Sequence, residues 1–370
     1  MQDEVGEISE KHARLEALRQ AHHLDAILLT RTDNIAWSTG GARGHIVVSQ
    51  DTGVCSILSD AQGFRLLTNN IEEGRILAEE LPPGTWRPVA LPWYAESVDE
   101  ALRRAEVSRV GADSHIHGTV FLGPAIAELR TPLLPVEMER YRALGRDTGE
   151  ALEHAARLVR VGDSEYQIVA RVAAGLIDRG IDPVVLLAAV DERIRRVRHP
   201  LPTALRVNER AMLVCCGRRH GLIASVTRIV HLGTLPDQWR LRQESCARVD
   251  AAYLGATVPG ATAGQIFAKA AAAYAAEGYP GEWEFHHQGG AAGYGPRDWL
   301  GTPTATQVVQ VNQGFAWNPS IAGTKVEDTV LLTDSGIEVI TASGDWPMLE
   351  VQSEGQRFSR PGILELATSA

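Results

Sequence analysis

The chain has 370 residues, which is enough for two or three domains, and its 44% of hydrophobic residues is typical of a globular protein. It carries 46 acidic and 36 basic side chains, and the net charge of −10 argues against nucleic acid or an anionic membrane as a partner. No apolar run reaches the ~20 residues of a membrane span, the charged N-terminus is unlike a signal peptide, and the four cysteines lack zinc spacing, so we expect a cytoplasmic protein.

The first part of the chain alternates short apolar strands with helices. The expected elements are a helix at 8–21, strands at 24–29, 45–49, 53–59, 65–69 and 109–113, and helices at 71–80 and 97–106. Strands that alternate with helices predict an α/β layer. Because two prolines within residues 131–135 interrupt the pattern, we expect one domain at 1–132 and a second at 133–370.

The second part begins with a long amphipathic helix at 136–158. Ser164 is the expected N-cap of the next helix, at 164–180. The elements that follow are a strand at 184–190, a hairpin of 210–217 and 221–230, helices at 235–255 and 264–277, a strand that carries His286 and His287, and strands at 330–336 and 337–343. Because side chains alternate along a strand, His286 and His287 should point to opposite faces, and we expect only His287 to face a functional site.

Three short motifs stand out between residues 282 and 329. His287 precedes two glycines in H-Q-G-G, Asn318 precedes a proline, and Glu327 begins the run E-D-T. In this order and spacing the motifs resemble the C-terminal half of the pita-bread fold family, which includes methionine aminopeptidase, Xaa-Pro aminopeptidase, prolidase and creatinase. The resemblance implies an α/β (α+β) protein: an N-terminal creatinase/prolidase-type domain followed by a pita-bread domain of the M24 peptidase type.

Metallopeptidases of this family hold two metal ions with Asp, Asp, His, Glu and Glu, in that order. The resemblance places these ligands at Cys215, Ser225, His287, Asn318 and Glu327. The hairpin that carries the first two is one residue shorter than in the family, so Val214 is an alternative to Cys215. Two divalent ions bring four positive charges, and buried charge needs anionic compensation. Since the remaining set supplies one carboxylate, we expect neither a metal ion nor another cofactor.

The resemblance also implies residues that contact a small-molecule substrate. His199 matches a family His that binds substrate or shuttles a proton, and an imidazole with an unperturbed pKa of ~6.5 suits that role. Tyr294 falls where the family has a second active-site His, and Arg228 ends the run that corresponds to Asp-Ile-Thr-Arg. Together with Cys215, Ser225 and Asn318, these two residues are the expected substrate contacts of the second domain.

The run Asn-Ile-Ala-Trp-x-Thr-Gly-Gly at 34–41 resembles the N-terminal domain of the creatinase and prolidase branch. In dimers of that branch this domain reaches the neighbour's site, so the resemblance implies a homodimer. It also makes Arg31 and Trp37 candidate substrate contacts, because the guanidinium fork of an arginine suits a carboxylate. The alternative is that both residues only complete a strand and its turn.

Three classes of function remain open. The first is a metal-independent enzyme of the creatinase type that acts on a C–N bond of a small amino-acid-like or biosynthetic substrate, by hydrolysis, elimination or rearrangement, with His199, His287 and Glu327 as catalytic residues. The second is a metallohydrolase, either with a single zinc on Cys215, His287 and Glu327 or with residual Xaa-Pro peptidase activity. The third is a pita-bread binding protein without catalysis.

Overall fold

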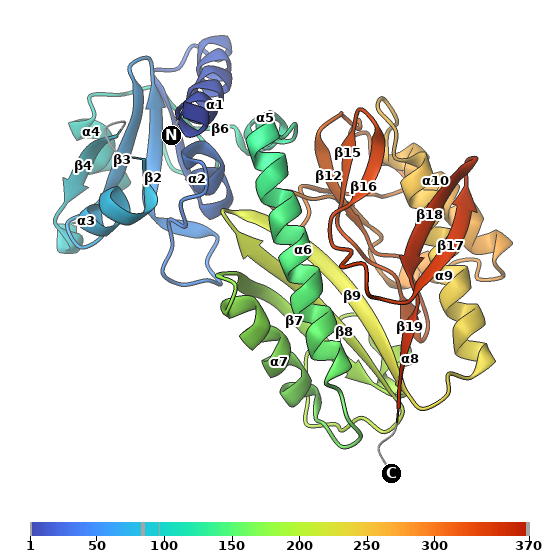
Figure 1. Ribbon diagram of the computed structural model, residues 1–370. Helices are drawn as coiled ribbons and strands as arrows, with labels where there is room; N and C mark the ends of the chain where they lie inside the picture. Colours follow the sequence, from blue (N-terminus) through green and yellow to red (C-terminus); the bar gives the residue numbers. More distant parts are fainter. Residues whose placement is uncertain (1, 83–85, 96, 368–370) are drawn as a thin grey trace. The chain divides into compact units, whose positions relative to one another are not determined.

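The computed structural model describes residues 2–82, 86–95 and 97–367. The chain forms two compact units (Figure 1): unit 1 comprises Met1–Val136 with His220–Leu222, and unit 2 comprises Glu137–Arg219 with Ile223–Ala370. The expected boundary after residue 132 lies just before this division. Within the described residues, the helices are too short or too polar for a membrane span.

Unit 1 is an α/β layer built on one six-stranded sheet, in the order β4-β3-β2-β1-β5-β6. Its strands are β1 Ala26–Arg31, β2 Thr52–Asp60, β3 Gly63–Asn69, β4 Arg87–Leu91, β5 Val110–Ala112 and β6 Val120–Phe121. Its helices are α1 Gln2–Ala21, α2 Thr32–Thr39, α3 Glu73–Arg75, η1 Ile76–Glu80, η2 Trp93–Ala95, α4 Val98–Arg104 and α5 Gly123–Arg130. The α/β layer expected from the sequence is confirmed.

Two expectations for unit 1 are wrong. The expected strand at 45–49 is a loop, and Ile46 in it is 60% exposed. In the part of the chain that the structure describes, the β-branched residues of this run have no partner strand, so they do not form a β-strand. Trp37 lies on α2, which ends at Gly40 in the left-handed conformation that glycine favours (φ 77°). Its ring is fully buried, so Trp37 is a core residue and not a substrate contact. Arg31 forms an ion pair with Asp33, at 3.2 Å from Nε to Oδ1.

Unit 2 contains a four-stranded sheet, β19-β9-β8-β7, and a five-stranded sheet, β11-β10-β12-β15-β16, with two small hairpins, β13-β14 and β17-β18. The strands of the first sheet are β7 Asp182–Val190, β8 Arg210–Arg219, β9 Leu222–Leu232 and β19 Ile363–Leu366. Those of the second are β10 Gly289–Ala291, β11 Trp299–Leu300, β12 Gln313–Trp317, β15 Val330–Thr333 and β16 Gly336–Val339. The hairpin strands are β13 Ser320–Ile321, β14 Thr324–Lys325, β17 Met348–Ser353 and β18 Gln356–Pro361.

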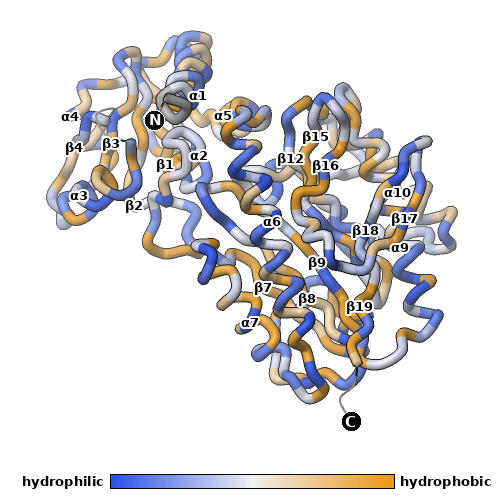
Figure 2. The backbone as a smooth tube through the Cα atoms, viewed as in Figure 1, coloured by the Kyte–Doolittle hydropathy of each residue, from blue (hydrophilic) through white to orange (hydrophobic). Residues whose placement is uncertain are grey.

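The helices of unit 2 are α6 Pro135–Arg157, α7 Glu165–Ile177, α8 Arg193–Arg196, α9 Asp237–Ala256, α10 Ala263–Ala276 and the short η3 Glu282–Phe285. The expected N-cap at Ser164 is confirmed as part of a capping box with Gln167. Helix α6 approaches the chain after β16 closely, because a Cβ on Gly149 would lie 2.2 Å from the carbonyl oxygen of Thr341. Figure 2 shows hydrophobic stretches along β7 and β8, and every residue from Arg210 to Gly217 is buried.

Two further expectations are corrected in unit 2. His286 and His287 are not on a strand: they follow η3 and precede β10, so the alternation that assigned them to opposite faces does not apply. The C-terminal segment, for which no strand was expected, forms the β17-β18 hairpin and then β19, which pairs in parallel with β9. Both differences arise from tertiary pairing, which local residue patterns do not encode.

Candidate functional site

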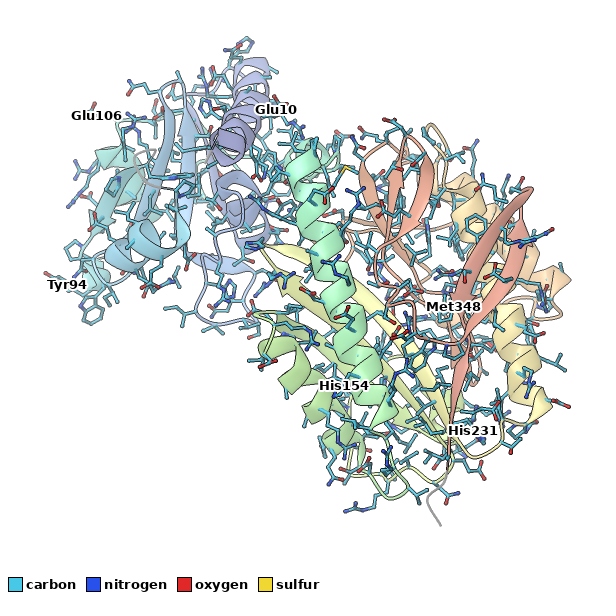
Figure 3. All side chains as sticks on the ribbon, in the orientation of Figure 1. Glu10, Tyr94, Glu106, His154, His231 and Met348 are labelled. Carbon is cyan, nitrogen blue, oxygen red and sulfur yellow. The ribbon has the colours of Figure 1, made fainter. Side chains whose placement is uncertain are left out.

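Three histidines of unit 2 meet at one point. His199 lies on the loop between α8 and β8, and its Nε2 is 3.1 Å from Nε2 of His286. One ligand atom of each of His199, His286 and His287 lies within 4.8 Å of the others. The other two histidines of this unit, His154 on α6 and His231 on β9, are labelled in Figure 3 and lie outside this group.

The loop conformations that bring the three histidines together are held by polar contacts. Arg198, next to His199, forms an ion pair with Glu282 of η3, at 2.5 Å from Nη2 to Oε2. Between the other two histidines and β10, the buried Gln288 side chain accepts a hydrogen bond from Tyr274 Oη at 2.9 Å and donates one to the carbonyl oxygen of His286 at 2.6 Å. The buried Gln288 side chain therefore fixes the segment that carries the other two histidines.

The glycines of the H-Q-G-G motif are required by a close approach of two strands. A Cβ on Gly289, whose φ is 84°, would lie 2.1 Å from the carbonyl oxygen of Ala316 on β12. Any side chain there would push β10 away from β12, and β10 follows His287 directly. The glycines therefore set the position of the histidines without taking part in chemistry.

The histidines open onto a pocket of about 460 Å³. Its volume is that of a small-molecule site. The residues around it are Arg198, His199, Phe267, Trp283, Glu284, Phe285, His286, His287, Gln288, Leu300, Gly301, Thr302 and Pro303. The lining thus combines imidazoles with aromatic and aliphatic side chains, which suits a small ligand that is partly polar and partly apolar.

The surroundings of all three imidazoles lower their pKa values and favour the neutral form of the ring. Burial and the positive charge of Lys325 lower the pKa of His286 to about 2, and burial and Arg297 lower that of His287 to about 4. Burial and Lys325 also lower the pKa of His199, whose side chain is more exposed. A neutral imidazole can accept a proton or bind a metal ion, so the charges around the histidines decide between these roles.

Glu327 is a carboxylate whose charge raises the pKa values of all three histidines. Both of its oxygens take part in ion pairs. Lys325 Nζ lies 2.8 Å from Oε2, which also accepts a hydrogen bond from Thr227 Oγ1 at 2.6 Å. Arg297 Nη2 donates to Oε1 at 2.9 Å. Burial alone would raise the pKa of Glu327, but the two cations hold it well below its usual range. Glu327 is therefore an ionised carboxylate bound by two protein cations.

The other positions of the expected metal site provide no acid. Ser225 Oγ lies 3.2 Å from Cys216 Sγ and accepts a hydrogen bond from Arg297 at 3.3 Å. Cys216, and not Cys215 or Val214, is thus the partner of Ser225 across β8 and β9. Cys215 is fully buried, and burial raises the pKa of its thiol well above the usual value.

This set does not fit a binuclear metal centre, because the retained carboxylate is already neutralised by Lys325 and Arg297. The alternative zinc set of Cys215, His287 and Glu327 is not brought together either. In the part of the chain that the structure describes, the group of three histidines is the one cluster with metal-ligand spacing. A divalent ion there would be repelled by the same two cations, whose charges already lower the pKa values of the histidines.

Asn318 lies beside the histidine segment. Its backbone N–H donates to the carbonyl oxygen of Gln288 at 3.1 Å, and its side chain is only 2% exposed. Among the described residues its Oδ1 has no hydrogen-bond partner. Buried polar atoms are rarely left unpaired, so this oxygen is a candidate hydrogen-bond acceptor for a ligand.

Two of the expected substrate contacts, Arg228 and Tyr294, are instead bonded to buried carboxylates of the fold. Arg228 is fully buried and bonded to Glu153 at 2.8 Å and to Asp328 at 2.9 Å, in an ion-pair network on the side of β9 away from Thr227. Tyr294 is buried and donates to Glu137 of α6 at 2.5 Å. Arg228 therefore stabilises the fold, and Tyr294 positions its loop against α6.

The sequence reasoning missed three residues of the site. His286 was set aside because a strand was assumed at its position. Lys325 lies two residues before Glu327, and Arg297 lies in the loop between β10 and β11, 30 positions away. A lysine this close to a retained metal-ligand position was a signal, since it places a cation where a metal ion would bind. Arg297 carried no signal in the sequence.

The chain matches two family descriptions. Residues 11–128 match the Creatinase/Prolidase N-terminal domain, and residues 139–334 match Metallopeptidase family M24. The second match spans more than half of the chain, and the two matches follow the order of the two units. The resemblance derived from the motifs of both parts is thereby confirmed.

Individual relatives share the fold at low identity. The solved prolidase from Pyrococcus horikoshii OT3 superposes with a TM-score of 0.76 at 17% identity, over 90% of this chain and 98% of that chain. The Xaa-Pro dipeptidase from Bacillus anthracis gives 0.76 at 15% identity, over 97% and 100%. Among curated proteins, agropine synthesis cyclase from Rhizobium rhizogenes is 31% identical over 140 residues. That match covers 35% of this chain and 35% of the relative, or about a third of its length.

Proposed function

Since the chain belongs to metallopeptidase family M24, we propose that it is an enzyme of that fold which works without a metal ion and acts on a C–N bond of a small amino-acid-like substrate. The observation that carries the proposal is the pairing of Glu327 with Lys325 and Arg297. A peptidase of the metal-dependent type needs a metal-bound hydroxide and a Lewis acid, and these two side-chain cations compete for the carboxylate that would hold the ions.

The histidines supply acid–base chemistry in this proposal. One neutral imidazole takes a proton from water while the water oxygen bonds to the carbon, and the imidazolium returns the proton to the leaving nitrogen as the C–N bond breaks. His199 is the residue assigned to this role, because it is the most exposed imidazole of the hydrogen-bonded pair and faces the pocket. His286 orients it through their shared hydrogen bond, and His287 and Asn318 contact the substrate.

Ring closure is a second candidate, favoured by the name of the curated relative, a cyclase of agropine synthesis. In this reaction a hydroxyl or amine of the substrate takes the place of water, and the same imidazole carries the same proton. The site therefore needs no additional residue. Loss of catalysis, with a binding role alone, remains the third class, but it gives no reason for the group of three histidines.

The experiment is a screen of metal-stripped protein, with chelator present, against amino acids that carry N-acyl, N-carbamoyl, N-amidino or N-alkyl groups. Mass spectrometry separates the two reactions, because the products of hydrolysis sum to the mass of the substrate plus one water, whereas ring closure with release of the nitrogen leaves the summed mass unchanged and gives no product that has gained water. We expect turnover in chelator by one of the two routes. Turnover that requires added zinc, manganese or cobalt would overturn the metal-independent mechanism.

A further inference from the structure

The ion pairs around Glu327 leave a positive charge uncompensated. Lys325 and Arg297 are both bonded to this one carboxylate. The three histidines do not contribute a charge when neutral. The ion-paired group of Lys325, Arg297 and Glu327 therefore holds one more cation than it holds anions.

In the described part of the chain, the charged residues around the pocket are not bonded to Lys325 or Arg297, and Glu284 among them is exposed to solvent. Arg198, which also lines the pocket, is balanced by Glu282 at 2.5 Å. Lys325 is almost completely buried, and the Arg297 side chain is 12% exposed. An unpaired charge with so little access to water is costly, and a bound anion would compensate it.

Two of the buried atoms that lack a hydrogen-bond partner among the described residues belong to Arg297 and Asn318, and they are of opposite kinds. Arg297 Nε is a donor, and Asn318 Oδ1 is an acceptor. The other guanidinium nitrogens of Arg297 donate to Glu327, to Ser225 and to the carbonyl oxygen of Pro296. An anionic oxygen of a ligand would satisfy the first atom, and an N–H group would satisfy the second.

We propose that Arg297 and Lys325 form an anion-binding site in the place of the family's metal pair, and that the substrate group bound there is a carboxylate with a neighbouring N–H. A carboxylate matches the single surplus charge, whereas a phosphate carries close to two negative charges at neutral pH. The partly exposed Arg297 makes the direct contact with the anion. Lys325 contributes through its positive charge, which neutralises Glu327. This inference rests on the proposed function in that it takes the anion to be part of the substrate.

The test compares two probes of nearly the same shape by titration calorimetry in metal-free buffer. N-acetylglycine carries a carboxylate and an amide N–H, and N-acetylglycinamide has the N–H but no charge. We expect the carboxylate to bind at least about tenfold more tightly than the amide. The preference should disappear in Arg297→Gln and in Lys325→Met, and it should persist in Lys269→Met, which removes an exposed lysine of the same unit.

Glu327→Gln should change the affinity for N-acetylglycine in the opposite direction. A gain in affinity cannot result from unfolding of the variant. The substitution removes the carboxylate and leaves two cations, so N-acetylglycine should bind more tightly, by about tenfold, while turnover falls. Equal affinity of the two probes for the wild-type protein, no binding of either probe, or a preference that survives in both Arg297→Gln and Lys325→Met would overturn the anion site.

The outcome is separable from the proposed function. Metal-independent turnover without any preference for the carboxylate would leave the enzyme proposal standing and refute the anion site. A clear preference in a protein that turns over nothing in the screen would support the anion site in a binding protein.

Discussion

The Nε2 atoms of His199 and His286 lie 3.1 Å apart although 87 positions separate the two residues in the chain. One imidazole must donate and the other accept, so the pair shares a proton whenever both rings are neutral. Ser320 Oγ lies 3.3 Å from the second nitrogen of His286 and extends the chain of hydrogen bonds by one group. A substitution at His286 therefore changes the hydrogen bonding of His199.

We expect His199→Ala to lower turnover by the ~10²–10⁴ that loss of a general acid or base typically costs, because no other group would carry its proton. His286→Ala should also be damaging, since it removes the hydrogen bond that orients His199. Steady-state kinetics on the substrate found in the screen measures both effects, and circular dichroism checks folding. His154→Ala, an exposed change on α6, is the matched control and should be close to wild type. Wild-type turnover in His199→Ala would exclude this mechanism.

Purified protein should contain much less than one equivalent of zinc, manganese, iron or cobalt per chain, because Lys325 and Arg297 neutralise the retained carboxylate. Elemental analysis after dialysis measures the metal content. Asn318→Glu restores one carboxylate of the family set and should still gain no metal, since the new acid would pair with the surplus cation. Two tightly held ions per chain would contradict this, and one zinc that is lost in His286→Ala would assign it to the histidine cluster.

Asp250 should make stability depend on pH. It is fully buried beside Arg360, with 2.6 Å between Oδ2 and Nε, and burial outweighs that ion pair and raises its pKa to about 7. The folded state thus binds this proton more tightly than the unfolded chain, whose Asp pKa is ~3.9. The contribution of Asp250 to the free energy of unfolding is complete below about pH 4. It is lost as the pH rises to about 7, by at most about 1.4 kcal/mol per pH unit.

Urea unfolding of the wild type and of Asp250→Asn at several pH values between about 4 and 8 isolates this group. The amide does not titrate, so the stability of the wild type relative to the variant should fall across this range and level off above about 7. The lowered pKa values of His286 and His287 make both proteins more stable with rising pH and cancel in the difference. A difference that is constant with pH would show that Asp250 does not take up the proton.

We propose a homodimer, because the N-terminal part of the chain matches the Creatinase/Prolidase N-terminal domain. Sedimentation velocity at micromolar concentration should give a mass near twice the 40.1 kDa of one chain. A single species at the mass of one chain would refute the dimer and leave the two-unit fold untouched.

The sequence by itself determined the two-part α/β organisation, the family and the loss of the metal ligands. These depend on features that are local or ordered along the chain: the cap at Ser164, the glycines after His287, and the uncharged residues at the ligand positions. Each of them acts through the backbone or the charge of a single residue, so it can be read without knowing what packs against it.

Only the tertiary structure decided which groups meet at the site. His286 joined His199 because a buried Gln288 turned the segment, and a local pattern had suggested a strand there. Arg297 and Lys325 converge on Glu327 from a loop and a hairpin, and Arg228 turns away into an ion-pair network although its neighbour Thr227 contacts the same carboxylate. Such choices depend on which distant charge compensates a buried one, and that free energy is decided between chain segments and not within them.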